Sequence, residues 1–397
     1  MQQIARKNMK IHGMINLISG IVFLLPIITL FYRYTWLDLS QIIFISNITT
    51  FSMFIFELPT SVWADTSGRK KSMFISLICN LIAAAFIFLF PTYRGFIIAA
   101  FFAALYRSFR SGTGQAFLEE NLRILWKEEE FGKHIGRFMF YGELVWLVTP
   151  IIASFILKLA GGQGYTILAW LDVISASILV YLVTQLKEPY PIQTKGKDLR
   201  TAIQENRETA KTAIANVFKN RSMRLLVIYR SLSHHVAFLW IIFLPLLSND
   251  GMPDRYAWFI ATIVSIGGIF ALKYAYKIGE RYSYNIAWIL WTTVQGILLI
   301  IAWLLTWSWI WLVIIYFIFQ IFDGIRQPSR NHVLVQLTKG KAIATTRSII
   351  FAIFALYMTG GKQFLALFEP KYALMGLGAF IVITNIVLGR KILNITK

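Results

Sequence analysis

Apolar residues run along this chain in long stretches that short polar segments separate. Twelve stretches approach or exceed the roughly 20 residues that a helix needs to cross the hydrocarbon core of a bilayer. Charged residues, Pro or Gly bound each of them, as at the ends of transmembrane helices. The pattern predicts an all-α membrane protein with twelve transmembrane helices, at residues 11–31, 39–63, 72–91, 95–120, 135–158, 164–186, 223–248, 256–279, 282–306, 308–336, 341–367 and 371–390.

Lys and Arg are distributed unevenly between the segments that connect these helices. With the N-terminus inside, the cytoplasmic segments hold 28 of them and the external loops hold five. Positively charged loops stay in the cytoplasm. We therefore expect both termini to be cytoplasmic and the chain to be a multi-pass protein of a bacterial inner (cytoplasmic) membrane.

The twelve predicted helices fall into two groups of six on either side of a long polar segment. This predicts an N-terminal six-helix bundle at 1–189, a cytoplasmic linker at 190–222 and a C-terminal six-helix bundle at 223–397. Within the linker, apolar residues recur at helical spacing among Lys and Arg. This pattern is typical of an amphipathic helix on the inner membrane surface, and a solvated helical linker fits it equally well. Two groups of six helices in one chain are typical of secondary transporters, which are built from internal repeats.

Composition excludes several other classes of protein. With 57% hydrophobic and 15% charged residues, the chain lies outside the range of soluble domains. The net charge of +20 does not indicate nucleic-acid binding, because the basic residues lie between apolar runs rather than on one solvated face. The first run is too long for a signal peptide and lacks a small-residue cleavage site. The single cysteine excludes an intrachain disulfide, the five histidines are not paired with acids at ligand spacing, and no cofactor is expected.

The loop after the second predicted helix carries the most specific motif. Residues 61–71 read SVWADTSGRKK, which resembles the G-x-L-A-D-x-x-G-R-K signature of the major facilitator superfamily. The resemblance implies two six-helix bundles that rock against each other around a central site. It also implies a cytoplasmic gate formed by the motif residues Asp65, Gly68, Arg69 and Lys70. Ser61 and Trp63 replace the first Gly and the Leu of the signature.

Weaker segments resemble drug-efflux members of the same superfamily. They are residues 107–114 in the fourth helix, residues 186–189 at the end of the sixth, Pro328 in the tenth and residues 344–348 at the start of the eleventh. The fifth helix contains Pro150 but lacks the full G-x-x-x-G-P-x-x-G-G pattern of many antiporters. The resemblance covers nearly the whole chain.

Ionisable residues inside predicted helices are candidate functional groups, because a charge at this depth is costly unless it is paired or hydrated. The resemblance implies that helices one, four, seven and ten line the central cavity, and five of the six deep basic residues lie on three of them. The candidate substrate-binding or coupling residues are Asp323, Arg107, Arg110, Arg230, Arg326, Glu57, Glu143, His234 and Asn16. Lys362 and Arg330 are further deep basic residues, and Asp172 lies nearer the outer end of its helix.

Several of these residues also have a structural interpretation. Glu57, Arg110 and Glu143 fall at similar depth, so a salt-bridge network between helices is as good an explanation as transport. Asn16 can contact substrate or hold helices together. Asp323 is either a coupling carboxylate or a permanent counterion of Arg326 or Arg330.

Three functions fit this pattern. The first is a proton-coupled secondary transporter that exports a drug-like or amphiphilic compound by alternating access. The second is a carrier, for import or export, of an anionic organic solute, because excess arginine suits carboxylates and phosphates. The third is a membrane sensor or assembly partner without transport activity. The chain shows no nucleophile and base set or phosphate-binding loop, so an enzyme is not expected. The expected partners are a small-molecule substrate, protons and lipid, with no nucleic acid, and the expected state is a monomer.

Overall fold

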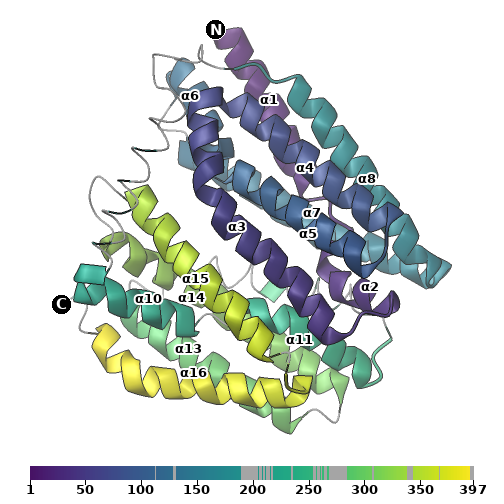
Figure 1. Cartoon of the computed structure of the whole chain (residues 1–397), viewed down its shortest axis with the longest axis vertical. Coiled ribbons are helices and arrows are strands. Elements are labelled where there is room, and N and C mark those ends of the chain that lie inside the picture. The colour runs from purple at the N-terminus through teal and green to yellow at the C-terminus, as the bar shows by residue number, and fades with distance from the viewer. Residues whose placement is uncertain are drawn as a thin grey trace. The chain divides into compact units, whose positions relative to one another are not determined.

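The described part of the chain, in a computed structural model, consists of α-helices, most of them long (Figure 1). No strand occurs among the described residues, and the chain divides into two compact units, Met1–Glu208 and Thr209–Lys397. The described residues are 1–111, 113–127, 131–188, 204, 208, 211, 215, 218–233, 236–253, 256, 260, 262, 266–267, 284–305, 308–337, 343–365 and 367–393.

The first unit contains the helices that were predicted as its six spans, two of them divided. Its elements are α1 (Gln2–Ser19), the short 3₁₀ helix η1 (Leu25–Ile27), α2 (Ile28–Tyr34), α3 (Leu39–Ser67), α4 (Arg69–Leu89), α5 (Tyr93–Arg110), α6 (Thr113–Ile124), α7 (Phe131–Ala160) and α8 (Gln163–Thr184). Helices α3, α4, α5 and α8 lie side by side, with α3 against α5 and α4 between α5 and α8 (Figure 1).

The first predicted span, 11–31, is not one continuous helix. Helix α1 ends at Ser19, and the chain is irregular until η1 begins at Leu25. Pro26 stands at the start of η1, where it has no N–H to donate and where its ring is incompatible with a helical carbonyl four residues earlier. The prediction of one continuous helix was therefore wrong, because hydropathy depends on the side chains and not on whether a backbone N–H is missing.

The fourth predicted span, 95–120, is also divided. Helix α5 ends at Arg110, and Ser111 leaves the helical region with φ −57° and ψ 119°. The sequence from 111 to 114 reads Ser-Gly-Thr-Gly, and these residue types have low helix propensity. The side chain of Thr113 donates to the carbonyl oxygen of Phe109 (2.8 Å) and so bridges the break.

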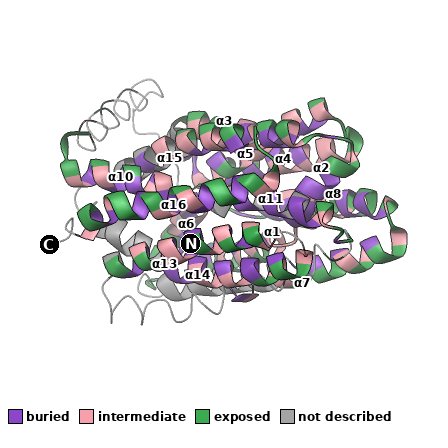
Figure 2. Cartoon of the chain, turned by 90° about the horizontal axis from the view of Figure 1, so that it is seen from below, coloured by how far each residue is buried: buried purple, intermediate pink, exposed green. Residues whose placement is uncertain are grey.

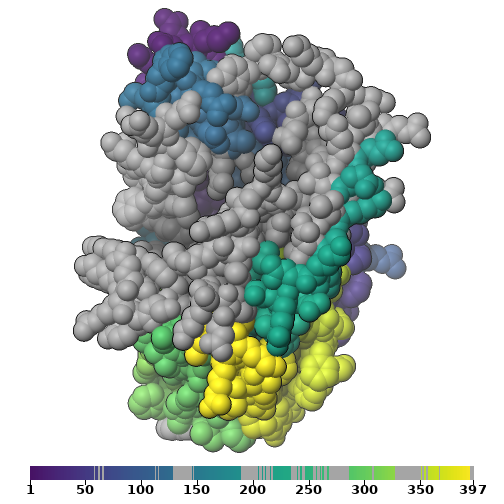
Figure 3. All heavy atoms as spheres, turned by 90° about the vertical axis from the view of Figure 1, so that its left-hand side faces the viewer, coloured from purple at the N-terminus to yellow at the C-terminus, as the bar shows by residue number. Residues whose placement is uncertain are grey.

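The second unit is described for most of five of its six predicted spans. Its elements are α10 (Arg221–Ser233), α11 (Val236–Asn249), α13 (Tyr284–Leu304), α14 (Trp309–Leu337), α15 (Ile343–Leu365) and α16 (Pro370–Leu393). Most of the predicted span 256–279 and most of the predicted linker 190–222 lie outside the described residues, so the amphipathic helix stays a prediction. Helix α10 packs against α16, and on the face shown in Figure 3 the teal atoms of α10 adjoin the yellow atoms of α16.

Each unit has an apolar core between its helices (Figure 2). In the first unit, Ile15 of α1, Leu77 of α4 and Phe117 of α6 meet Val183 of α8. In the second unit, the core contains Met223, Leu226, Val227, Tyr229, Trp288, Ile350 and Ile392. Where α13 crosses α16, Gly296 and Gly378 face each other. A Cβ on Gly378 would lie 2.6 Å from the carbonyl oxygen of Gly296, so only small residues permit this close approach.

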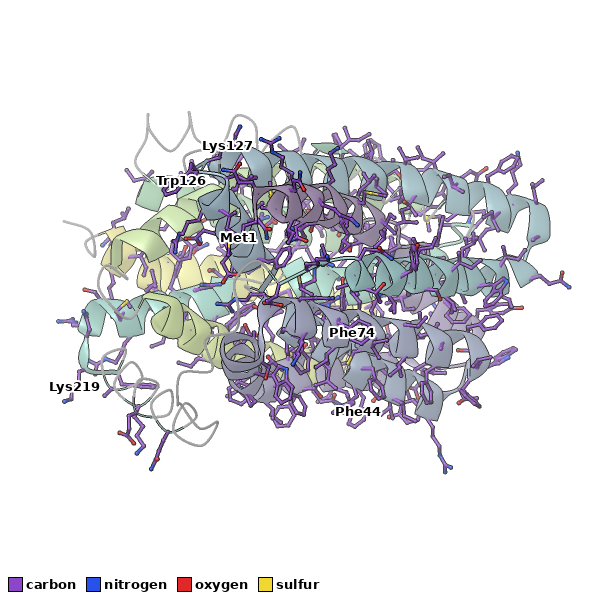
Figure 4. All side chains as sticks on the ribbon, turned by 90° about the horizontal axis from the view of Figure 1, so that it is seen from above. Met1, Phe44, Phe74, Trp126, Lys127 and Lys219 are labelled. Carbon is purple, nitrogen blue, oxygen red and sulfur yellow. The ribbon has the colours of Figure 1, made fainter. Side chains whose placement is uncertain are left out.

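Large apolar side chains also cover the outer faces of the helices. Phe44 of α3 and Phe74 of α4 are exposed (Figure 4), as are Phe155 of α7 and Ile386 of α16. Exposed apolar faces on long helices are expected where lipid replaces water as the solvent. By length and composition, six helical segments within the described part of the chain can cross a membrane: Leu39–Glu57, Arg69–Leu89, Gln163–Thr184, Ile286–Leu304, Trp309–Arg326 and Pro370–Leu393.

The predicted orientation can be tested by labelling single cysteines in a Cys79→Ser background, since Cys79 is the only native cysteine. Trp36 and Trp126 are exposed in connections between helices, and Asn249 is exposed at the end of α11. We expect a membrane-impermeant maleimide to label positions 36 and 249 only from outside and position 126 only from the cytoplasm, because the basic segments stay inside. Labelling of position 249 from the cytoplasmic side alone would contradict the orientation.

Candidate functional site

The motif loop between α3 and α4 consists of one residue, Gly68, with φ 101° and ψ 150°. This backbone region is essentially restricted to glycine. The carboxylate of Glu188, just beyond α8, accepts hydrogen bonds from the backbone N–H groups of Arg69 (2.7 Å) and Lys70 (3.0 Å). A negative charge at the first turn of a helix is favourable, because the N–H groups there have no partner within the helix. The motif loop is therefore fixed by an acidic residue 119 positions away.

Asparagine side chains hold Glu188 in place. The side chain of Asn8 in α1 donates to the carbonyl oxygen of Lys187 (2.8 Å) and accepts from its N–H (3.0 Å). Asn8 also donates to Asn121 of α6 (2.9 Å). The ends of α1, α4, α6 and α8 are thus tied together at one end of the unit, where Met1 and Trp126 also lie (Figure 4).

The four predicted gate residues are partly described. The backbone N–H groups of Arg69 and Lys70 bind Glu188 as above, and a Cβ added to Gly68 would lie 3.0 Å from Oε1 of Glu188. The guanidinium of Arg69 forms an ion pair with Glu120 of α6, with 3.5 Å between Nε and Oε1. Asp65 lies in the last turns of α3, and its side chain is outside the described residues. The gate role of these residues stays a prediction.

Arg110, at the end of α5, is bonded to neutral groups only. Its Nη1 donates to the hydroxyls of Ser19 (2.8 Å) and Tyr106 (2.9 Å), and its Nη2 donates to Oδ1 of Asn16 (3.1 Å). The guanidinium also lies 5.7 Å from the centre of the Tyr106 ring. Among the described residues, no carboxylate is within ion-pair distance of Arg110. The predicted candidates Asn16 and Arg110 therefore meet at the last turn of α1.

The other candidates of the first unit do not complete a salt-bridge network with Arg110. Glu57 of α3 accepts a hydrogen bond from the hydroxyl of Ser111 (2.7 Å) rather than from Arg110. The side chain of Glu143 is outside the described residues. Arg107 is exposed, and within the described part of the chain it makes no hydrogen bond or ion pair. Since α5 places residues three apart on one face, Arg107 and Arg110 share a face of this helix.

The second unit contains a buried ion pair on α14. Arg326 is fully buried and Asp323, one turn earlier, is almost so. Both Nε (3.1 Å) and Nη2 of Arg326 donate to Oδ1 of Asp323, and Nη1 donates to the carbonyl oxygen of Ser233 at the end of α10 (3.2 Å). The pair therefore links α14 to α10, which belongs to the predicted seventh span.

Four further candidates with basic side chains are predicted in the second unit. The guanidinium of Arg230 lies 5.8 Å from the centre of the Phe354 ring. Lys362 is buried in α15. Arg330 and His234 fall outside the side chains that the structure describes.

A family model described as Major Facilitator Superfamily matches residues 13–361 of the chain. The chain belongs to this superfamily. Solved structures agree: a mutant of the nucleoside transporter NupG is similar with a TM-score of 0.75 and 13% identity, covering 99% of this chain and 100% of that one. A D-xylose-proton symporter is similar with a TM-score of 0.68 and 14% identity, covering 98% and 96%.

A POT family transporter in complex with 5-aminolevulinic acid is similar to this chain with a TM-score of 0.71 and 11% identity, covering 100% of this chain and 96% of that one. At such identities these structures show the fold alone. A search of curated protein sequences found no match. Membership of the superfamily indicates a multi-pass membrane transporter rather than an enzyme, and a small-molecule substrate. The drug-efflux subtype that the weaker motifs predicted is not confirmed.

Two residues of this superfamily member were overlooked as functional candidates. In the sequence, Glu188 stands out only as part of the motif that ends the sixth predicted helix, and Asn8 does not stand out. One signal was available for Glu188, because it is an isolated acid at a helix end in a strongly basic segment. Asn8 carried no comparable signal, since its role depends on a contact 179 residues away.

Proposed function

We propose that this chain is a secondary active transporter that carries a small solute with a carboxylate or phosphate group by alternating access, and that Arg110 binds that group. The observation that supports this is the set of partners of Arg110, which are two hydroxyls and one amide oxygen. A guanidinium within a membrane protein normally pairs with a carboxylate, because leaving its charge uncompensated is costly.

Neutral partners position the guanidinium without neutralising it. Arginine presents five N–H donors in a planar fork that matches the oxygen atoms of a carboxylate or phosphate. An arriving anion would replace the bonds to the neutral acceptors Asn16 and Ser19 with bonds in which donor and acceptor are both charged, and a carboxylate or phosphate can accept two of them in parallel. Arg107, exposed on the same face of α5, adds a second positive charge. A cationic amphiphile would be repelled here, so the anionic solute is favoured over the drug-like cation.

Direction and coupling belong to the same proposal. Export driven by protons remains the expectation for this protein, with Asp323, Glu57 and Glu143 as the carboxylates predicted from sequence. Asp323 pairs with Arg326, whereas Glu57 accepts a hydrogen bond from the neutral hydroxyl of Ser111. A sensor without transport activity remains the alternative of another class, and solute flux in proteoliposomes separates it from a transporter.

Thermal stability of the purified protein in the presence of ligands tests the proposed solute class. The probes are 5-aminolevulinic acid, succinate, glycerol 3-phosphate, xylose, uridine and tetraphenylphosphonium. We expect anionic probes to stabilise the protein, by about 2.7 kcal/mol at a hundredfold excess over Kd. Arg110→Lys should lower the affinity for the anionic probe that binds best by roughly 10–100-fold, since lysine keeps the charge but loses the planar set of N–H donors.

Arg94→Lys is the matched control, because Arg94 is an exposed arginine at the other end of the same helix. It should bind the anionic probe as the native protein does. Stabilisation by tetraphenylphosphonium or xylose alone, with equal binding by native protein and Arg110→Lys, would contradict an anionic solute at this site.

A further inference from the structure

The break in the first transmembrane helix is held by a residue of α8. The carboxylate of Asp172 accepts hydrogen bonds from the backbone N–H groups of Phe23 (2.7 Å) and Leu24 (3.0 Å), one on each oxygen. The hydroxyl of Ser175, one turn further along α8, contacts the carbonyl oxygen of Ile21 (3.4 Å). These bonds satisfy backbone groups that a continuous helix would pair internally, which is a requirement within a bilayer.

No basic side chain in the described part of the chain pairs with Asp172. Its hydrogen-bond partners are the two backbone N–H groups, and its helix packs against α1, α4 and α7. The side chains of residues 131–144 in α7 are outside the described residues. No described charged or titratable side chain of these helices or of α2 makes a hydrogen bond or ion pair with this carboxylate. These side chains are Arg6, Lys7, Lys10, His12, Tyr32, Arg33, Tyr34, Arg69, Lys70, Lys71, Cys79 and Lys158.

From this geometry we propose that Asp172 is a proton-binding site whose occupancy controls the break in the first transmembrane helix. The ionised carboxylate uses both oxygens as acceptors and so holds Phe23 and Leu24. Protonation removes the charge and turns one oxygen into an O–H donor, which cannot accept from a backbone N–H in the same way. One of the two bonds is then lost, the other is weakened, and the irregular segment is released from α8.

The position of the break gives this release a consequence for transport. Helix α1 ends at Ser19, and Asn16 and Ser19 in its last turn hold Arg110. Movement of the segment after Ser19 would therefore change the partners of Arg110, and an anion bound to Arg110 would in turn favour one state of the segment. This link rests on the proposed function, whereas protonation of Asp172 does not.

Hydrogen–deuterium exchange of the purified protein without any solute tests the proposal. The probe is a peptide that covers residues 20–28, and its exchange is corrected for the intrinsic effect of pH. We expect protection of the Phe23 and Leu24 amides to fall by about tenfold between about pH 9 and about pH 5, the change expected from losing one charge-assisted hydrogen bond. Asp172→Asn should show the low-pH exchange of the native protein at every pH.

Ser175→Ala is the matched control, because it removes the other tie to the segment without removing a titratable group. It should raise exchange at all pH values and keep the pH dependence. Equal protection of the native segment at both pH values would overturn the proposal, even if Asp172→Asn failed to fold. A pH response that persists in Asp172→Asn would also overturn it, since another group would then titrate. Neither result affects the test of Arg110, which uses anionic probes.

Discussion

Replacing Arg326 with methionine should destabilise the protein by roughly 3–5 kcal/mol, the usual cost of removing one partner of a buried ion pair. Arg326 is fully buried, and two of its nitrogen atoms contact the carboxylate of Asp323. Without the guanidinium, a carboxylate that is almost completely buried would have lost its countercharge, and the carbonyl oxygen of Ser233 would have lost a donor. The measurement is the thermal or denaturant-induced unfolding of the protein in detergent.

Two comparisons distinguish a buried pair from a general effect of the substitution. Arg390→Met changes an exposed arginine at the end of α16 and should alter stability by less than about 0.5 kcal/mol. The double variant Asp323→Leu with Arg326→Met should be more stable than Arg326→Met alone, because it leaves no unpaired charge. If Arg326→Met unfolds like the exposed control, the pair contributes nothing to the stability of the second unit.

The same variants address the role of Asp323 in coupling. A coupling carboxylate must lose and regain its proton during transport, whereas a permanent counterion keeps its charge. The close contact with Arg326 supports the counterion interpretation, which the sequence had left open. Coupling through Asp323 therefore stays a prediction.

Replacing Gly68 with alanine should be the most damaging change in the motif loop. At φ 101° and ψ 150°, a residue other than glycine is strained by on the order of 1–3 kcal/mol. The new Cβ would also lie 3.0 Å from Oε1 of Glu188, so the carboxylate would be pushed from the N–H groups of α4. We expect lower stability and a weaker cytoplasmic gate. Spin labels at positions 36 and 249, in the predicted outer loops of the two lobes, should report a shift toward the inward-open state in a distance measurement.

Gly161→Ala is a suitable control, because Gly161 also has a positive φ, 56°, but a Cβ there would meet no atom within 4 Å. It should cost about 1 kcal/mol and leave the distance distribution unchanged. Glu188→Gln, which keeps the shape but loses the charge, should show part of the effect of Gly68→Ala. Lower stability of Gly68→Ala without any shift in the distances would mean that the loop has a structural role but not the gate role implied by the superfamily.

Comparison of particular residues shows where sequence reasoning succeeded. The motif at 61–71 indicated the superfamily, because a sharp turn between two helices requires a glycine such as Gly68 within a short, recognisable segment. Asp323 and Arg326 were singled out for their depth and their one-turn spacing, and the structure pairs them. Arg110 and Asn16 were named separately, and the contact between them was not predicted.

The breaks in the first and fourth spans were missed for one physical reason. Hydropathy measures the transfer of side chains into lipid and is indifferent to whether a backbone N–H has a partner. The break at residues 20–24 is stable because Asp172 supplies acceptors from about 150 residues away. A window of twenty residues contains no trace of such a partner.

The sequence by itself determined that this chain is a helical membrane protein of the Major Facilitator Superfamily, since long apolar runs and a compact motif are local properties. The tertiary structure alone decided which charges are compensated. Arg326 has a carboxylate, Arg110 has only neutral partners among the described residues, and the carboxylates of Glu188 and Asp172 bind backbone N–H groups rather than basic side chains. Whether a charge in a membrane protein is structural or available depends on the atoms that surround it, and distant parts of the chain supply those atoms.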